Sequence, residues 1–311
     1  MSSSPHSSAQ TSSARSIGVT CAALGALGFS FKAIFIKAAY AYGVDAETLL
    51  ALRMGYAVPF FVVMALYIAQ HQPMKITRRD RLVLVVLGLL GYYAASYLDF
   101  LGLRYITASL ERLILFLYPT IVLLLSAAFL GKPIRVGMLV PLAICYVGIA
   151  LAVSHDFNVG GSNVAVGCAL VFASSLSYAG YLMLSGEVVS RLGSTRVTAF
   201  ATGVACALSI GQFLVMRPIG NLVQPWQVHA LSICMAIFST VLPIWLVSEA
   251  IRRLGAGPAS MVGTLGPVFT ILLATLLLHE PLGVMQIAGA VLVIFGVSRI
   301  SRVTKGAEKE H

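Results

Sequence analysis

Long apolar stretches separated by short polar segments dominate this chain. Each stretch is about 20 residues long, which is the length that a helix needs to cross the hydrocarbon core of a bilayer. Lipid leaves an open strand edge without hydrogen-bond partners, so we expect these stretches to be helices. The pattern predicts ten transmembrane helices, over residues 17–40, 46–69, 82–103, 107–130, 136–154, 164–185, 197–216, 229–251, 256–279 and 282–299.

The composition agrees with this pattern and narrows the class of protein. Of the 311 residues, 59% are hydrophobic and 10% are charged, and the mean hydropathy is +0.92. A soluble domain carries about 25% charged residues, so the composition excludes a soluble enzyme, a nucleic-acid-binding domain and a disordered scaffold. The Ser-rich residues 1–15 are expected to form a disordered tail, with a second tail at 300–311.

The net charge of +10 reflects where Lys and Arg gather in the loops. If the N-terminus lies inside, the outer loops carry only Arg104 and Arg217, whereas the inner loops carry ten Lys and Arg. Those ten are Lys75, Arg78, Arg79, Arg81, Lys132, Arg135, Arg191, Arg196, Arg252 and Arg253. Cytoplasmic loops are enriched in Lys and Arg. The charges therefore predict a multi-pass protein of the plasma membrane, the inner membrane of a bacterium, with both termini in the cytoplasm.

A shift of 148 residues aligns the second half of the chain with the first. It superposes Pro119 on Pro267 and Gly148 on Gly296. Five helices per copy is an odd number, so the two copies must insert with opposite orientations. Inverted repeats with a binding site at their interface are a recurrent plan of secondary transporters. The predicted five-helix repeats are residues 16–154 and 164–299.

Short motifs in both halves resemble a known family. They are GFSFK at 28–32, LALR at 50–53, TASLERLILFLYP at 107–119 and GAGPASMVGTLGP at 255–267. They are similar to the ten-span members of the drug/metabolite transporter superfamily, which carry two EamA-type domains. That family has an acidic residue after spans four and nine; Glu280 matches the second, whereas Lys132 stands near the first. The resemblance implies an all-α integral membrane protein that exports small metabolites, often amino acids.

Five ionisable residues lie inside the predicted spans. A charge near the bilayer centre costs about 2.5–3.5 kcal/mol on insertion scales and is a functional hypothesis by default. With a rise of about 1.5 Å per residue, all five fall into one layer in the outer third of the membrane. They are Lys32, Arg53, Asp99, Glu111 and Arg112. We interpret the layer as a substrate site, a gate or a structural ion-pair cluster, with snorkelling to the lipid edge as the alternative.

Tyrosines and helix-breaking residues mark a second set of candidates. Tyr93 and Tyr97 share one helix face on span three, and Tyr178 and Tyr181 share one on span six. A buried phenol needs a hydrogen-bond partner, so these faces predict a polar path, with aromatic packing or an interfacial belt as the alternative. Proline frees a backbone carbonyl inside a helix, which favours either substrate contact or a packing kink. The remaining candidates are Tyr118, Pro119, Thr264 and Pro267.

No motif indicates catalysis, metal binding or nucleotide binding. The sequence contains neither GxxxxGK[ST] nor HExxH, which would mark a phosphate loop and a zinc protease. The five cysteines lie inside apolar runs without metal-type spacing, and we interpret them as packing residues. The chain is therefore not expected to be an enzyme or to hold a cofactor, while proton coupling stays open.

Together these patterns predict a secondary transporter that works by alternating access. Its expected cargo is a small zwitterionic or carboxylate-bearing metabolite, such as an amino acid or a derivative. The cations would attract a carboxylate, and Glu111 or Asp99 would take an ammonium group or carry a proton. The alternatives are an organic-cation or drug exporter and a membrane receptor or scaffold without transport. The expected partners are the bilayer and a small molecule but no nucleic acid, and the chain would act as a monomer or a weak homodimer.

Overall fold

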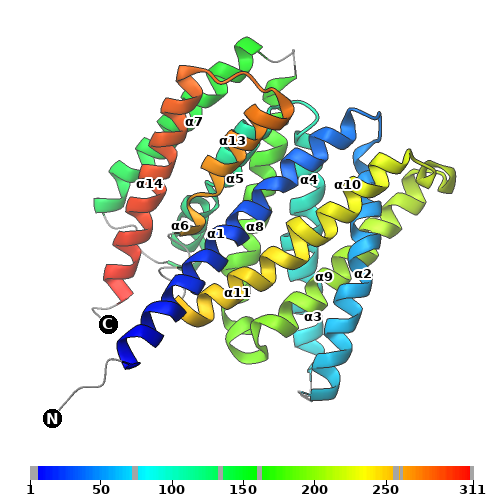
Figure 1. The fold of residues 1–311 in the computed structure, drawn as a ribbon, viewed down its shortest axis with the longest axis horizontal. Helices are drawn as coiled ribbons and strands as arrows, with labels where there is room; N and C mark the ends of the chain where they lie inside the picture. The colour runs from blue at the N-terminus through cyan, green and yellow to red at the C-terminus, as the bar shows by residue number, and fades with distance from the viewer. Residues whose placement is uncertain are drawn as a thin grey trace.

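The structure, a computed structural model, describes residues 6–71, 76–131, 136–159, 163–254, 259 and 262–308. Within these ranges the chain is helical and forms no strand. Figure 1 shows helices packed side by side, with α1 beginning and α14 ending at the same end of the assembly. We call this the proximal end and the opposite one the distal end.

The elements follow the predicted order. In the first half they are α1 (His6–Tyr40), α2 (Ala46–His71), α3 (Arg78–Gly88), the π-helix η1 (Leu89–Ala94), α4 (Ala95–Gly102), α5 (Ala108–Leu115), α6 (Tyr118–Leu130), the 3-10 helix η2 (Val136–Met138) and α7 (Leu139–Val159). In the second half they are α8 (Val164–Leu192), α9 (Ser194–Met216), the 3-10 helix η3 (Ile219–Leu222), α10 (Trp226–Ala236), the π-helix η4 (Ile237–Val241), α11 (Leu242–Leu254), α13 (Gly266–Leu278) and α14 (Val284–Glu308).

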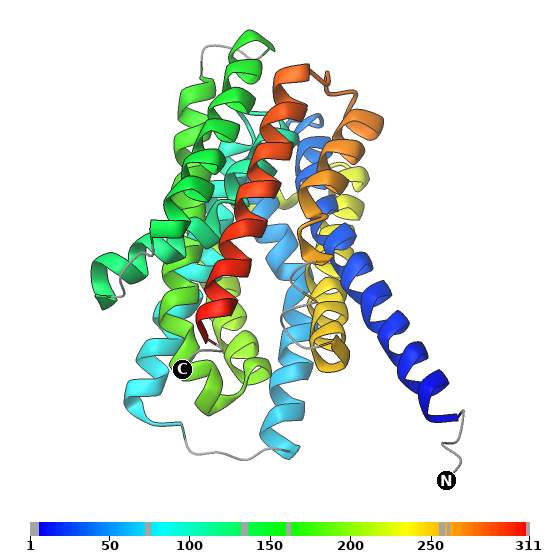
Figure 2. The same cartoon turned by 90° about the vertical axis from the view of Figure 1, so that its left-hand side faces the viewer.

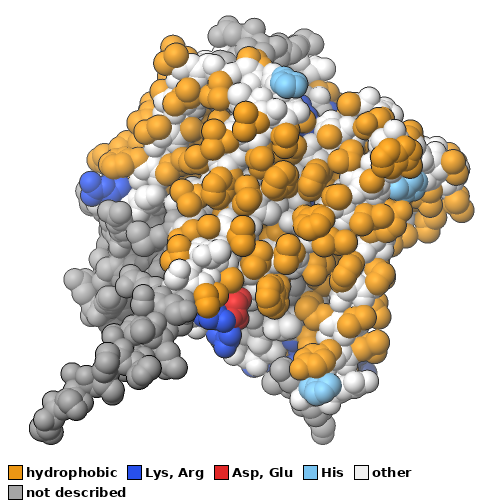
Figure 3. Space-filling model, in the orientation of Figure 1, with side chains coloured by type: hydrophobic (Ala, Val, Ile, Leu, Met, Phe, Trp, Pro, Cys, Tyr) orange, Lys and Arg blue, Asp and Glu red, His pale blue; other side chains and the backbone are white. Residues whose placement is uncertain are grey.

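The described residues contain seven helical segments that are long and apolar enough to cross a membrane, and three shorter apolar helices. Several elements join into one segment: α3, η1 and α4 span Arg78–Gly102, and α10, η4 and α11 span Trp226–Leu254. Each predicted span contains a helix. The face drawn in Figure 3 is covered mainly by hydrophobic side chains, as expected for contact with lipid. The predicted all-α membrane class is confirmed.

Two helices extend beyond the predicted apolar stretches. Helix α1 begins at His6, within the Ser-rich segment that the composition predicts to be disordered, and α14 continues to Glu308. Figure 2 shows the first turns of α1 leaving the other helices. The chain between His6 and Ile17 contains no Gly or Pro, so nothing local stops the helix from continuing. Residues 1–5 and 309–311 lie outside the described ranges.

Helix irregularities recur at the predicted interval of 148 residues. The π-helices η1 and η4 begin at Leu89 and Ile237, which are equivalent positions of the two copies. Helices α6 and α13 both end at a residue with positive φ, Gly131 at 63° and His279 at 53°. The two halves therefore share their local backbone geometry as well as their hydrophobic pattern.

Equivalent helices of the two copies pack against each other. Helix α7 packs against α14 and α2 against α9, and the two members of each pair run in opposite directions (Figure 1). A Cβ added to Gly289 would lie 2.4 Å from the carbonyl oxygen of Gly148, so this approach of α14 to α7 requires residues without side chains. Antiparallel pairing of equivalent helices is the arrangement that inverted repeats produce.

The two copies also exchange contacts. Helix α1 of the first copy packs along α11 and α13 of the second, and α8 of the second copy packs along α4, α5 and α6 of the first. Each copy thus buries its first helix against the other copy. The interior of the protein is consequently built from both halves of the chain.

Candidate functional site

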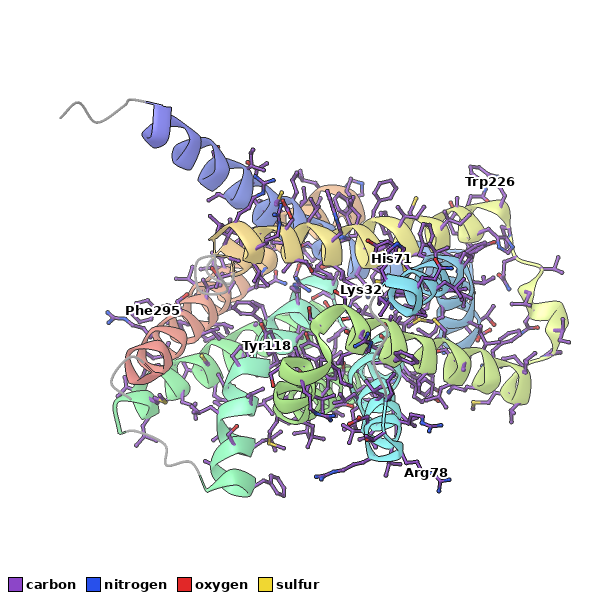
Figure 4. The ribbon with its side chains drawn as sticks, turned by 90° about the horizontal axis from the view of Figure 1, so that it is seen from below. Lys32, His71, Arg78, Tyr118, Trp226 and Phe295 are labelled. Carbon is purple, nitrogen blue, oxygen red and sulfur yellow. The ribbon has the colours of Figure 1, made fainter. Side chains whose placement is uncertain are left out.

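Lys32 lies at the centre of a buried ion cluster. Its Nζ is 2.6 Å from Oδ2 of Asp99 and 3.5 Å from Oε1 of Glu111. Asp99 is 1% exposed and Glu111 is 0% exposed. The three side chains come from α1, α4 and α5, and Figure 4 shows Lys32 near the middle of the helices, away from the peripheral Trp226. The structure thus brings three of the five predicted charges into contact.

This cluster contains more acceptors than donors. One ammonium group faces two carboxylates, and Oδ1 of Asp99 and Oε2 of Glu111 receive no hydrogen bond from the part of the chain that the structure describes. Buried polar atoms are normally satisfied, so these oxygens mark a place for a cationic group or a proton. Among the described residues, no three His, Cys, Asp or Glu side chains gather as a metal site requires.

The other two predicted charges are arginines that flank the cluster. Arg112 points toward α13, because a Cβ added to Gly266 would lie 2.7 Å from its Nη2. Arg53 on α2 donates from Nη2 to Oγ1 of Thr240 at 3.2 Å, and its guanidinium lies 5.5 Å from the centre of the Phe100 ring. Within the described ranges neither arginine forms a salt bridge. The predicted layer is therefore one ion cluster with two separate cations beside it.

The candidate tyrosines divide between two places. Tyr118 of α6 meets Tyr178 of α8 with ring centres 5.4 Å apart, and Tyr178 stacks on Tyr181 at 5.7 Å. Tyr92, which sequence reasoning did not single out, lies 5.4 Å from Tyr181. This set of four is called the tyrosine group below. It brings side chains of both copies together in the interior.

The other pair of tyrosines belongs to a contact between the copies at the distal end. Tyr97 donates to Oε1 of Glu47 at 3.0 Å. Arg217, just after α9, contacts Oε2 of Glu47 at 3.2 Å and Oδ1 of Asp45 at 3.4 Å. The hydrogen bond from Arg217 to Glu47, together with the nearby Asp45, raises the pKa of the guanidinium. Tyr93 stacks on Tyr97, so both tyrosines support this contact.

The helix that carries the acid and the arginine of the site is held at its N-terminus by two carboxylates. Glu280, which follows α13 of the second copy, accepts from the backbone N–H of Ala108 at 2.7 Å and from Oγ of Ser109 at 3.0 Å. Asp156 of α7 accepts from the N–H of Thr107 at 3.0 Å. Negative groups stabilise the N-terminus of a helix. These contacts give the acid after span nine a structural role in positioning α5.

The candidate prolines begin helices instead of bending their middles. Pro119 lies in the first turn of α6 and Pro267 in the first turn of α13, where a missing N–H costs little. Thr264 lies in the turn just before α13. Residues 255–258 and 260–261, which precede it, lie outside the described ranges. The turns before α6 and α13 thus lie at equivalent positions of the two copies.

Sequence reasoning missed a set of buried hydroxyl groups on the second copy. Thr202 and Ser209 of α9, and Ser232 and Ser239 of α10 and η4, are at most 2% exposed. Their hydroxyl oxygens have no hydrogen-bond partner within the described ranges. Each pair is spaced by seven residues, which places its members on one helix face. That spacing in an apolar span was the signal available in the sequence.

Comparisons with known proteins agree with the fold and the repeat. A family model described as the EamA-like transporter family matches residues 16–154 and again residues 165–302. A protein of Bacillus subtilis (strain 168) named "Uncharacterized transporter YcbK" is 30% identical over 297 residues, which cover 92% of this chain and 94% of that protein. A second from the same organism, "Uncharacterized transporter YyaM", is 25% identical, covering 91% of this chain and 95% of its own. A crystal structure with 18% identity matches at a TM-score of 0.59, over 94% of this chain and 99% of that one, which shows a shared fold.

These matches confirm the resemblance seen in the sequence motifs. The family model covers both halves of the chain. The two relatives are named as transporters, and the chain matches nearly their whole length. The chain belongs to the EamA-like transporter family and is a multi-pass membrane transporter.

Proposed function

We propose that this transporter exports a small zwitterionic or carboxylate-bearing metabolite, such as an amino acid or a derivative, by alternating access. The observation that carries the proposal is the cluster of Lys32, Asp99 and Glu111, in which two buried carboxylates keep free acceptor atoms. A substrate ammonium group would satisfy these acceptors. The buried Arg53 and the partly buried Arg112 flank the same region and would attract the negative end of the substrate.

The position of the cluster supports a role in alternating access. Its acids lie on α4 and α5 and its lysine on α1, which packs against α11 and α13 of the other copy. A movement of α11 and α13 that carries α1 with them would therefore change the distances between the lysine on α1 and the acids on α4 and α5. A bound substrate would bias that movement, because it would interact differently with the protein before and after the movement.

We also propose that export is coupled to a proton. One ammonium and two carboxylates leave an excess negative charge in a buried place, which is unfavourable unless a further positive charge joins it. A proton on either Asp99 or Glu111 would balance the cluster when no substrate ammonium is bound. Substrate release and proton uptake would then alternate at the same pair of acids.

An organic-cation or drug exporter is the second candidate. The observation that favours it is the tyrosine group, whose four rings lie near one another in the interior. Aromatic faces attract organic cations, and the excess of carboxylates in the cluster would add to this attraction. An organic cation offers no negative group to the flanking arginines and leaves them without a role, so we place this candidate second.

For location, we propose the plasma membrane, the inner membrane of a bacterium, with both termini in the cytoplasm. Arg78, Arg79, Arg81 and Arg191 all lie toward the proximal end, where α1 begins. We further propose that one chain suffices for transport, as a monomer or within a weak homodimer. Inverted repeats within one chain place the substrate site at the interface between the repeats, so a single chain contains both halves of the site.

The test compares the metabolites in cells and medium with and without the protein. The proposal expects at least one amino acid or related carboxylate to accumulate in the medium, and the Asp99→Asn variant to abolish that accumulation. The same compound would then be loaded into vesicles containing the purified protein, and its efflux measured with and without a pH gradient. Accumulation of organic cations alone would favour the second candidate, and efflux that ignores the pH gradient would refute proton coupling.

A further inference from the structure

Arg53 is a buried cation that forms no salt bridge within the described ranges, although Asp99 attracts it at longer range. It is 7% exposed and lies on α2. Its Nε and Nη1 atoms have no hydrogen-bond acceptor among the described residues. Asp99 precedes Phe100, whose ring Arg53 contacts, but the Asp99 carboxylate is 2.6 Å from Lys32. A buried and unpaired charge opposes folding, so stability alone does not explain this arginine.

Two uncharged groups hold the guanidinium in place. Thr240, in the π-helix η4, donates its hydroxyl to the carbonyl of Met235 at 3.0 Å and accepts from Nη2 of Arg53 at 3.2 Å. The Phe100 ring lies beneath the guanidinium at 5.5 Å. Single π-turns inside helices are frequent at functional sites. The arginine is therefore oriented by uncharged groups and forms no salt bridge within the described ranges.

The face of α9 that packs against α2 brings two hydroxyl groups to the same region. The Sγ atom of Cys206 lies 3.7 Å from the carbonyl oxygen of Met54, the residue that follows Arg53 in the chain. Thr202 and Ser209 lie four residues before and three residues after Cys206, on the same helix face. Both are 1% exposed, and neither hydroxyl has a partner in the described part of the chain.

Helix α10 and η4 contribute a matching pair. Ser232 and Ser239 are at most 2% exposed, and their hydroxyls likewise lack a partner among the described residues. They lie on either side of Met235, which packs in one core cluster with Met54, Phe100 and Cys206. Unsatisfied hydroxyls thus lie on the two helical segments whose residues Cys206 and Met235 pack in the same core cluster as Met54, the residue after Arg53.

We propose that Arg53, assisted by hydroxyl groups from this set, forms the subsite that binds a carboxylate of the exported metabolite. The proposal rests on the proposed function and assigns the negative end of the substrate to one place. Charge-assisted hydrogen bonds from a guanidinium to a carboxylate are among the strong ones, and hydroxyl groups can donate to the second oxygen. Asp99 and Phe100 are adjacent in the chain, so the ammonium and carboxylate ends of one small molecule would bind on neighbouring elements. The second copy then takes part in binding through α9, α10 and η4.

The test measures the thermal stability of the purified protein without ligand. Arg53→Met removes a buried charge that has no salt bridge in the described ranges and keeps much of the side-chain length, so we expect it to raise the melting temperature. The control is Arg217→Met, because Arg217 is exposed to 39% and paired with Glu47 and Asp45; this change is expected to lower the melting temperature or leave it unaltered. A lower melting temperature for Arg53→Met, or a failure of this variant to fold, would overturn the subsite.

A second measurement uses a panel of amino acids, each paired with the amine that lacks its carboxylate. We expect at least one amino acid to stabilise the wild-type protein while its amine does not, and Arg53→Met to weaken that effect more than tenfold, with Arg53→Lys between the two. Equal stabilisation of wild type and Arg53→Met by the amino acid would refute the subsite but leave the proposed function standing. Stabilisation by amines alone would instead refute the zwitterionic substrate itself.

Discussion

Lys32 is the residue whose removal tests the ion cluster most directly. Among the described residues, Lys32 is the cation that forms salt bridges with Asp99 and Glu111, and Lys32→Gln leaves two carboxylates that are 1% and 0% exposed. We expect a large loss of stability, because the lost attraction is not replaced by hydration. Arg53→Met has the opposite expected sign, since Arg53 forms no salt bridge within the described ranges and its buried charge is costly.

The magnitude follows from the two distances. With an effective dielectric constant of about 20, unit charges attract by about 6 kcal/mol at the 2.6 Å between Lys32 and Asp99, and by about 5 kcal/mol at the 3.5 Å between Lys32 and Glu111. The desolvation of the three groups offsets much of this attraction in the intact protein. Breaking one buried pair by removing a partner lowers stability by about 3–5 kcal/mol, and we expect Lys32→Gln to lie in this range.

The assay heats a fluorescently tagged protein in detergent and follows the folded fraction by size-exclusion chromatography. The triple variant Lys32→Gln, Asp99→Asn, Glu111→Gln removes all three charges with little change of shape and should regain most of the lost stability. The matched control is Lys37→Gln, on the same helix, since Lys37 forms no salt bridge among the described residues. Equal melting of Lys32→Gln and Lys37→Gln, or a triple variant no more stable than the single one, would refute the coupled cluster.

Three further changes test the packing, the helix cap and the orientation. Gly289→Val places a side chain where an added Cβ would lie 2.4 Å from the backbone of α7, and it should lower stability by about 1–3 kcal/mol. The control is Gly203→Val, whose Cβ would meet nothing within 4 Å. Gly289→Val should give less folded protein in detergent than this control, and equal yields would contradict the α7–α14 contact. Glu280→Ala removes the acceptor at the N-terminus of α5, which should lower the local stability of this helix by about 0.5–2 kcal/mol and speed its hydrogen exchange accordingly. Glu280→Gln should have a smaller effect, and unchanged exchange in Glu280→Ala would reject the cap. In a background without native cysteines, Arg79→Cys should react only with reagents that enter the cell and Val223→Cys with reagents outside it, and the reverse pattern would overturn the proposed orientation.

The sequence by itself determined the class, the spans and the repeat. Lipid sets the length of an apolar stretch and forbids open strand edges, so the hydrophobic pattern alone predicts where helices cross. The shift of 148 residues that aligned Pro119 with Pro267 also predicts equivalent backbone geometry, and the π-helices that begin at Leu89 and Ile237 confirm it. Pro119 indicated an irregularity in span four, but the complete turn between α5 and α6 was not predicted, because a proline fits a kink inside a helix as well as the first turn of a new one.

The partners of each charged residue were decided only by the tertiary structure. Depth along a helix follows from counting residues, and it placed five charges in one layer without stating which of them meet. Glu111 and Arg112 are neighbours in the chain, yet consecutive side chains on a helix point about 100° apart. Glu111 therefore faces Lys32 while Arg112 faces Gly266.

The same holds for contacts between the two halves of the chain. Glu280 caps a helix that lies about 170 residues earlier, and Arg53 meets a threonine 187 residues later. No local pattern encodes such a pairing, because it depends on how two inverted copies pack and on which small residues let their helices approach. The sequence specified the helices and their depth, and the packing of one copy against the other specified the site.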